Sequence, residues 1–215
     1  MTERTFRKAR KKPGKRPAPA EETSTRERIL AAAEELFAAQ GFAATTSRQI
    51  AEKAGFALGN MYNYFPTKEA VFEAVLDELA RRYYSPDEPL QKVLREMAFP
   101  DDLESLGEAI GDSFRRFDSY VRLVYVDVLE FKGAHLARLY QGLKARFGKV
   151  FAKRLEKGAF SKEIDPTLGV VLAFMSYSFY FTVEQTFGVR GHLGPDQRRV
   201  VHDIARIIRR GVLER

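Results

Sequence analysis

Residues 45–72 contain two short helix signals joined by a glycine turn, and this spacing constrains the fold more than any other feature of the chain. Thr46, with a glutamine three residues later, forms a capping box that starts a helix, and Gly55 ends that helix. A second short helix is predicted from about Leu58 to Phe65, where a proline stops it. Two helices separated by so short a turn form a helix-turn-helix unit, so this part of the chain is predicted to be entirely helical.

The rest of the chain repeats apolar residues at helical spacing, and no stretch alternates in the manner of a β-strand. Ser24, with a glutamate three residues later, forms another capping box. The predicted helices outside the helix-turn-helix unit cover residues 24–41, 67–84, 88–97, 102–119, 120–131, 135–157, 165–187 and 195–213. The predicted fold class is therefore all-α.

Three regions are expected along the chain. Residues 1–22 form a disordered basic arm, and residues 23–84 form a three-helix domain that contains the helix-turn-helix unit. Residues 85–215 form a larger helical domain for ligand binding and dimerisation.

The positive charge of the chain is concentrated in the arm. The first 20 residues hold eight Lys or Arg and one Glu, which accounts for the whole net charge of +7. Such a segment is typically disordered on its own and attracts nucleic acid without sequence preference. It could also serve only as a solubilising tail.

Composition excludes several kinds of site. Cysteine is absent, which excludes disulfides, thiolate metal sites and a cysteine nucleophile and suits a reducing cytoplasm. We expect a cytoplasmic protein, because the first residues lack the apolar core of a secretory signal. Residues 166–183 carry no charge but lie between amphipathic helices, so a buried helix is expected there and no membrane span.

Neither a metal nor a cofactor is predicted. His135, His192 and His202 are far apart, and none has a second ligand at helical spacing. Motifs for nucleotide binding or for a serine nucleophile are also missing from the sequence.

The second helix of a helix-turn-helix unit enters the major groove of DNA. Its exposed residues are predicted to be Leu58, Gly59, Asn60 and Asn63. An asparagine amide can pair with an adenine edge, and a leucine can pack on a thymine methyl group. Gly59 would let the backbone approach the bases closely.

A second set of residues suits the DNA backbone. Tyr62 and Tyr64 carry hydroxyl groups that can bind phosphate oxygens, and helix starts offer free N–H groups and the positive end of a dipole. The residues predicted at two such helix starts are Thr46, Ser47, Arg48 and Lys68.

This stretch resembles the DNA-binding domain of the tetracycline-repressor (TetR) family of bacterial regulators. The matching residues are Ile29, Ala32, Ala33, Leu36, Phe37, Gly41, Phe42, Thr45, Thr46, Ile50, Ala51, Ala54, Gly55, Gly59, Met61, Tyr62, Tyr64, Phe65, Lys68 and Glu69. The resemblance implies that residues 45–48, 58–64 and 68 face a DNA operator. It also implies a dimeric regulator, usually a repressor that a small ligand releases from DNA. Two departures are Ala57, where the family commonly has a capping serine, and Leu58, where it often has a polar residue.

The last two helices are expected to form the dimer interface, as in that family. The helix over residues 165–187 is apolar almost all round, so it needs neighbours on more than one face. The interface residues are predicted to be Val171, Met175, Val200, Ile204, Ile207 and Ile208. Such a homodimer would bind a pseudo-palindromic double-stranded operator.

A largely apolar effector is expected in the larger domain, lined by Phe114, Phe117, Tyr125, Phe131, Phe174 and Tyr177. Two alternatives remain open from the sequence. One is an all-α enzyme that uses this aromatic cavity with Asp127 and Glu130 as an acid/base pair. The other is an architectural protein that binds DNA without sequence preference.

Overall fold

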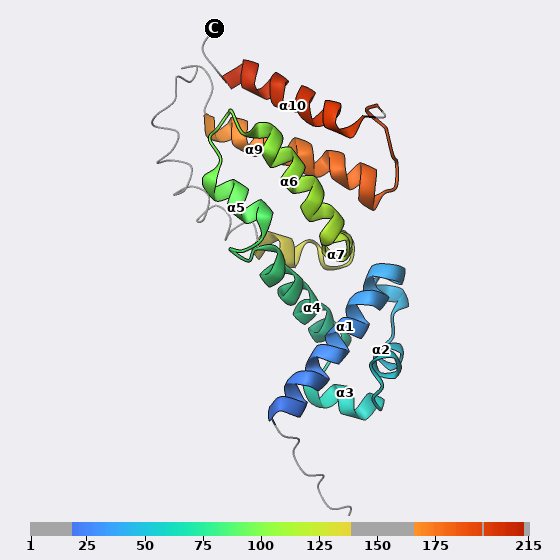
Figure 1. Ribbon diagram of the computed structural model, residues 1–215. Coiled ribbons are helices and arrows are strands. Elements are labelled where there is room, and N and C mark those ends of the chain that lie inside the picture. Colours follow the sequence, from blue (N-terminus) through green and yellow to red (C-terminus); the bar gives the residue numbers. More distant parts are fainter. Residues whose placement is uncertain (1–18, 139–165, 195, 213–215) are drawn as a thin grey trace, which may run out of the picture.

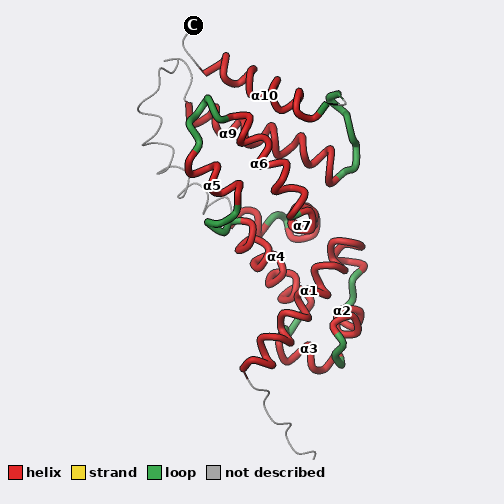
Figure 2. Tube along the Cα trace, in the orientation of Figure 1, coloured by secondary structure: helices red, strands yellow, loops and turns green. Residues whose placement is uncertain are grey.

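The computed structural model describes residues 19–138, 166–194 and 196–212, and the regular elements in these ranges are all helices (Figure 2). They are α1 (Pro19–Ala44), α2 (Ser47–Ala54), α3 (Leu58–Tyr64), α4 (Lys68–Tyr83), α5 (Pro89–Glu96), α6 (Leu103–Arg116), α7 (Asp118–Phe131), α9 (Pro166–Phe181) with a π-helical turn (Thr182–Thr186), and α10 (Gln197–Val212). The all-α prediction is confirmed.

The helices gather at two ends of the molecule (Figure 1). At one end, α2 of the helix-turn-helix pair packs against both α1 and α3, and α4 leads from there toward the other end. At that end α6 packs on α9, and α10 covers both of them. The helix α7 lies between the two groups and contacts both α1 and α4.

The first helix starts earlier than predicted. It begins at Pro19, so Ser24 lies inside the helix and is not its cap. Proline is well tolerated in the first turn, where its missing N–H would have no partner. The other end agrees with the prediction, since Gly41 has a non-helical backbone (φ 80°, ψ 173°) that interrupts α1 before a last short turn.

The predicted caps of the next helices are present. The Thr46 hydroxyl accepts a hydrogen bond from the Gln49 N–H at 3.2 Å, and the Gln49 side chain accepts one from the Thr46 N–H at 2.8 Å. The Thr67 hydroxyl accepts from the Ala70 N–H at 3.1 Å and caps α4. These local bonds satisfy N–H groups that a helix start leaves free.

Glycine allows α6 to lie close to α9. A side chain at Gly107 would come within 2.8 Å of the Tyr177 ring, and one at Gly111 within 2.5 Å of the Phe181 ring. The Tyr177 hydroxyl also donates to the Val201 carbonyl oxygen at 3.1 Å and so joins α9 to α10.

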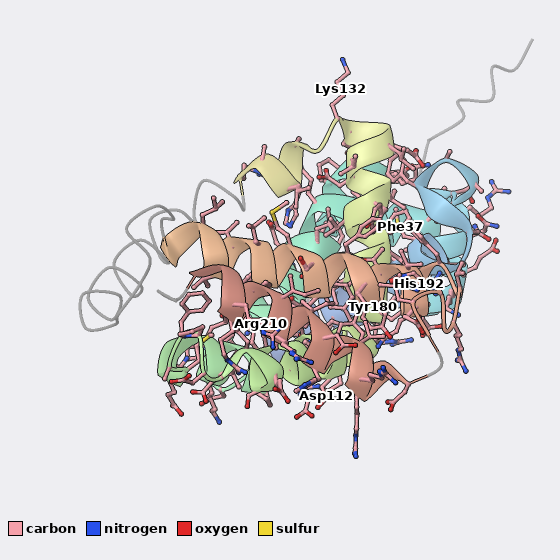
Figure 3. All side chains as sticks on the ribbon, turned by 90° about the horizontal axis from the view of Figure 1, so that it is seen from above. Phe37, Asp112, Lys132, Tyr180, His192 and Arg210 are labelled. Atoms are coloured by element: carbon pink, nitrogen blue, oxygen red, sulfur yellow. The ribbon has the colours of Figure 1, made fainter. Side chains whose placement is uncertain are left out.

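Two loops complete the larger domain. After α9, the chain returns past Tyr180, whose ring lies beside that of His192 with centres 5.3 Å apart (Figure 3). Lys132 ends α7 in a left-handed conformation and points away from the body of the molecule (Figure 3).

Of the helix predicted over residues 135–157, the part up to residue 138 is helical and the remainder lies outside the described residues. Within the described ranges, no helix is long and apolar enough to cross a membrane.

Candidate DNA-binding interface

Gly55 forms the turn between α2 and α3. Its backbone is left-handed (φ 77°, ψ 33°), a conformation that glycine adopts without steric cost. Beside this turn, the Arg28 guanidinium donates to the Ala54 carbonyl oxygen at 2.7 Å and lies over the Phe56 ring, 4.4 Å from its centre. Arg28 therefore fastens the turn to α1, a role that sequence reasoning did not assign.

The helix α3 has one buried and one exposed face. Met61 is fully buried, and Leu58 and Tyr64 are half-buried against the core. The exposed residues are Gly59, Asn60, Tyr62 and Asn63. The prediction that Leu58 is exposed is wrong, because Leu58 lies three residues before Met61 and so shares its inward face.

The start of α2 presents Thr46 and Arg48 to solvent, while Ser47 is half-buried. The Thr46 hydroxyl is engaged as the helix cap. From α1, the Gln40 amide donates to the Gln49 side chain at 3.4 Å and braces this corner. Nothing in the local sequence pattern points to Gln40, because the contact depends on how α1 and α2 pack.

Lys68 has a structural role that the sequence did not predict. Its ammonium donates to the carbonyl oxygens of Phe42 and Thr45, both at 2.8 Å, and lies 4.0 Å from the centre of the Phe42 ring. Two of its three hydrogens thus hold the turn that leads from α1 into α2. A lysine free to bind phosphate was expected here, and at most one hydrogen is left for that purpose.

Similarity to known proteins is strongest in this region. The chain is 37% identical over 83 residues to the transcriptional repressor KstR2 of Mycolicibacterium smegmatis, and the match covers 35% of this chain and 40% of that protein. The match therefore spans less than half of the length of that relative.

The fold as a whole resembles solved transcriptional regulators. One is the fatty acid degradation regulator FadR of Bacillus halodurans, with a TM-score of 0.63 and 20% identity over 91% of this chain and 97% of that one. Another is the ketosteroid transcriptional regulator KstR2 of Mycobacterium tuberculosis, with a TM-score of 0.58 and 20% identity over 88% and 95% of the two chains.

A family model decides the assignment. Residues 29–75, which comprise most of α1, the helix-turn-helix pair and the first half of α4, match the model of the tetR family of bacterial regulatory proteins. The DNA-binding domain of this chain is thus of the tetR type. The resemblance read from the sequence is thereby confirmed.

The aromatic residues predicted to line an effector cavity lie in separate contacts. Phe131 packs against Phe42 and Phe72, with ring centres 4.7 and 4.9 Å away. Tyr125 packs against Phe187 at 5.5 Å. Phe131 therefore belongs to the junction between α7 and the amino-terminal helices, which corrects its predicted place in a cavity.

The other four predicted cavity residues are spread over α6, the start of α7 and α9. Phe114 lies near Phe181 at 6.4 Å, and the ring of Phe117 meets that of Tyr83 at 5.4 Å. Tyr177 is fully buried between α6 and α10, where it serves packing and not a cavity wall. Phe174 is half-buried. Long-range packing, which helical spacing cannot reveal, separates these residues.

The residues predicted to form the dimer face are mostly exposed or half-buried. Val171, Met175 and Ile207 are 46%, 56% and 71% exposed, and Ile204 and Ile208 are half-buried. Val200 is 8% exposed and belongs to the core of its own chain, so its assignment to the interface is corrected. Further exposed apolar residues on the same helix as Val171 are Leu168, Leu172 and Phe179.

Asp127 and Glu130 serve different parts of the chain and not a shared acid/base site. Asp127 is buried and accepts from the N–H groups of His135 and Leu136, at 3.2 and 3.0 Å. Glu130 is exposed and accepts from the Ala43 N–H at 3.3 Å. The alternative that the chain is an enzyme depended on these two residues as an acid/base pair, and the structure does not bring them together in one site.

Proposed function

We propose that this chain is a sequence-specific DNA-binding transcriptional regulator that acts as a repressor. The observation that carries the proposal is the exposed face of α3, formed by Gly59, Asn60, Tyr62 and Asn63. The side-chain amides of Asn60 and Asn63 form no hydrogen bond with the described residues, so they are available to base edges.

The geometry around α3 suits reading of the major groove. The helix is held from behind by Met61 and at its start by the turn that Arg28 fastens. Thr46 and Arg48 lie exposed at the neighbouring helix start, where phosphate oxygens can bind. A rigid helix with flanking phosphate contacts can hold Asn60 and Asn63 in register with the bases.

The proposed dimer uses the exposed apolar stripe of α9 and the adjacent face of α10. A row of large apolar side chains on the surface of one chain usually marks an interaction surface. A twofold dimer would place two copies of α3 on half-sites about 34–36 Å apart, one turn of DNA. Residues 1–22 would add sequence-independent charge to this contact.

We further propose that a small, largely apolar effector releases the operator. KstR2 and FadR are named for ketosteroids and for fatty acid degradation, and both chemistries are largely apolar. A path for release exists in α7, whose last residues contact Ala43 and the Phe42 ring of the amino-terminal domain. The regulator would work in the cytoplasm, where its operator lies.

The decisive experiment compares specific with non-specific DNA. Sites are selected from a random duplex library, and binding of the best site and of a scrambled duplex is measured by fluorescence anisotropy at one salt concentration. A specific regulator binds its site at least about a thousandfold more tightly. Equal affinities for the two duplexes would instead support the architectural alternative.

A further inference from the structure

Five side-chain polar atoms in the described part of the larger domain are buried without a hydrogen-bond partner there. Two of them are on aromatic rings: the Tyr120 hydroxyl and the Nε2 atom of His135, in residues that are 3% and 5% exposed. The Tyr84 phenol lies beside Tyr120. Buried polar groups are nearly always paired, because an unmade hydrogen bond costs about 1–3 kcal/mol. A missing partner is therefore the simplest explanation.

The two groups are neighbours and have complementary roles. Their rings meet edge to face, with centres 6.4 Å apart. Burial raises the pKa of Tyr120, so its phenol stays protonated and can donate. Burial also lowers the pKa of His135, which keeps the imidazole neutral. The Asp77 carboxylate lies 3.6 Å from Nδ1 and favours the tautomer with the proton there, so Nε2 is an acceptor.

The charges around His135 disfavour an anionic ligand. Asp77, Asp127 and Glu73 act on the ring, against one cation, Arg138. Both oxygens of Asp127 already accept backbone N–H groups, whereas the other two carboxylates are exposed. A carboxylate brought to this place would meet net negative charge in a partly desolvated setting.

A surface hollow lies next to residues that flank this pair. It has a volume of about 610 Å³ and is lined by Asp77, Ala80, Arg81, Tyr84, Ser85 and Pro86. Asp77 and Tyr84 are the two lining residues that also lie against His135 and Tyr120. Around the pair, the Tyr83 ring lies 5.3 Å from that of Tyr120 and 5.4 Å from that of Phe117. Aromatic surroundings of this kind suit a ring-bearing ligand.

We propose that Tyr120 and His135 form the polar end of the effector site and bind the hydroxyl group of a neutral, ring-bearing, otherwise apolar ligand. The hydroxyl oxygen accepts from Tyr120, and its hydrogen is donated to Nε2 of His135. A ketone or an ether can satisfy the first contact but not the second. Binding of this ligand does not require the proposed function to be correct. Only the effect of binding on the operator rests on the proposed function.

That consequence follows from the position of Tyr120 on α7. Tyr120 lies in the first turn of this helix, and Glu130 and Phe131 in its last turn contact Ala43 and Phe42. His135 lies just beyond the helix and is held by Asp127 of the same helix. A ligand that draws Tyr120 and His135 together therefore acts on the helix that supports the α1–α2 turn.

The test uses the full chain without DNA and three matched probes: para-propylphenol, its methyl ether and para-propylbenzoate. Calorimetry at neutral pH should give an affinity for the phenol about tenfold higher than for the ether, the size of one buried hydrogen bond. The benzoate should bind more weakly than the phenol. Equal affinities for phenol and ether, stronger binding of the benzoate, or failure of the phenol to bind would each overturn the proposal.

Variants separate recognition from packing. Tyr120→Phe should abolish the preference for the phenol and should not lower the thermal midpoint, because it removes an unpaired hydroxyl. Tyr177→Phe is the matched control: its hydroxyl is paired with Val201, so this variant should lose stability and keep the preference. A preference unchanged in Tyr120→Phe would overturn the assignment. Operator binding is measured separately. If the chain shows no DNA specificity but still prefers the phenol, that result contradicts the proposed function and leaves the ligand site standing.

Discussion

The Glu130 carboxylate, in the last turn of α7, accepts a hydrogen bond from the Ala43 N–H across 3.3 Å. Ala43 lies in the short turn between Gly41 and the start of α2. This bond, with the Phe131 ring packed on Phe42, joins the larger domain to the end of α1, just before the helix-turn-helix pair. The α1–α2 turn is thus held from one side by Lys68 and from the other by α7.

Replacement of Glu130 should therefore affect DNA binding without unfolding the chain. In Glu130→Ala, operator affinity should fall between about two- and tenfold, the range of one hydrogen bond. Anisotropy measures the affinity, and circular dichroism checks the fold. Leu129→Ala is the control, since Leu129 is 81% exposed on the same helix. Equal effects of the two variants would contradict a specific role of the Glu130 contact.

Asn60 should read a base. Asn60→Ala should cost about 1–3 kcal/mol on the selected operator and little on scrambled DNA, because a base-edge contact discriminates whereas a phosphate contact does not. The exposed amide in the middle of α3 motivates the prediction. Anisotropy on both duplexes decides it, and equal losses would make Asn60 a backbone contact.

Gly59 should matter for DNA and not for the fold. A side chain added there would meet nothing within 4 Å, and alanine is favoured over glycine in a helix by about 0.5–1 kcal/mol. Gly59→Ala should therefore raise the stability of the free protein and weaken operator binding, because the new methyl group would lie between α3 and the groove. Stability is measured by urea unfolding. Unchanged affinity would show that the groove leaves room at this position.

Ala57 leaves α3 uncapped. It occupies the N-cap position with an extended backbone (φ −69°, ψ 145°), and no side chain accepts from the first turn. Ala57→Ser should stabilise the helix start by roughly 0.5–2 kcal/mol, and amide exchange at Asn60 and Met61 should slow in the free protein. Part of the gain should appear as tighter operator binding, because less ordering remains on DNA. Faster or unchanged exchange would contradict the capping role.

The dimer prediction is now best tested at Ile207. This residue is 71% exposed, so Ile207→Asp should leave the single chain folded and should yield monomers in sedimentation. Leu129→Asp is the matched control, because it also puts a charge at an exposed leucine but lies on α7. If the Ile207 variant still sediments as a dimer, the interface lies elsewhere.

Local sequence determined the boundaries of α2, the start of α3 and the start of α4. The caps at Thr46 and Thr67 and the turn at Gly55 were all predictable, because each depends on atoms within three residues of one another and on the φ angle of a single glycine. The uncapped start of α3 at Ala57 was predictable for the same reason.

Only the tertiary structure decided how those helices use their side chains. Leu58 packs against the core because it lies on the same face of the short helix α3 as the buried Met61. Lys68 donates to two carbonyl oxygens that lie 26 and 23 residues away in the sequence. Tyr177 and Phe131 became packing residues because glycine brings α6 onto α9 and because α7 ends against α1. Helical spacing gives the direction of a side chain around its own axis, but it contains no information on which helix will meet it.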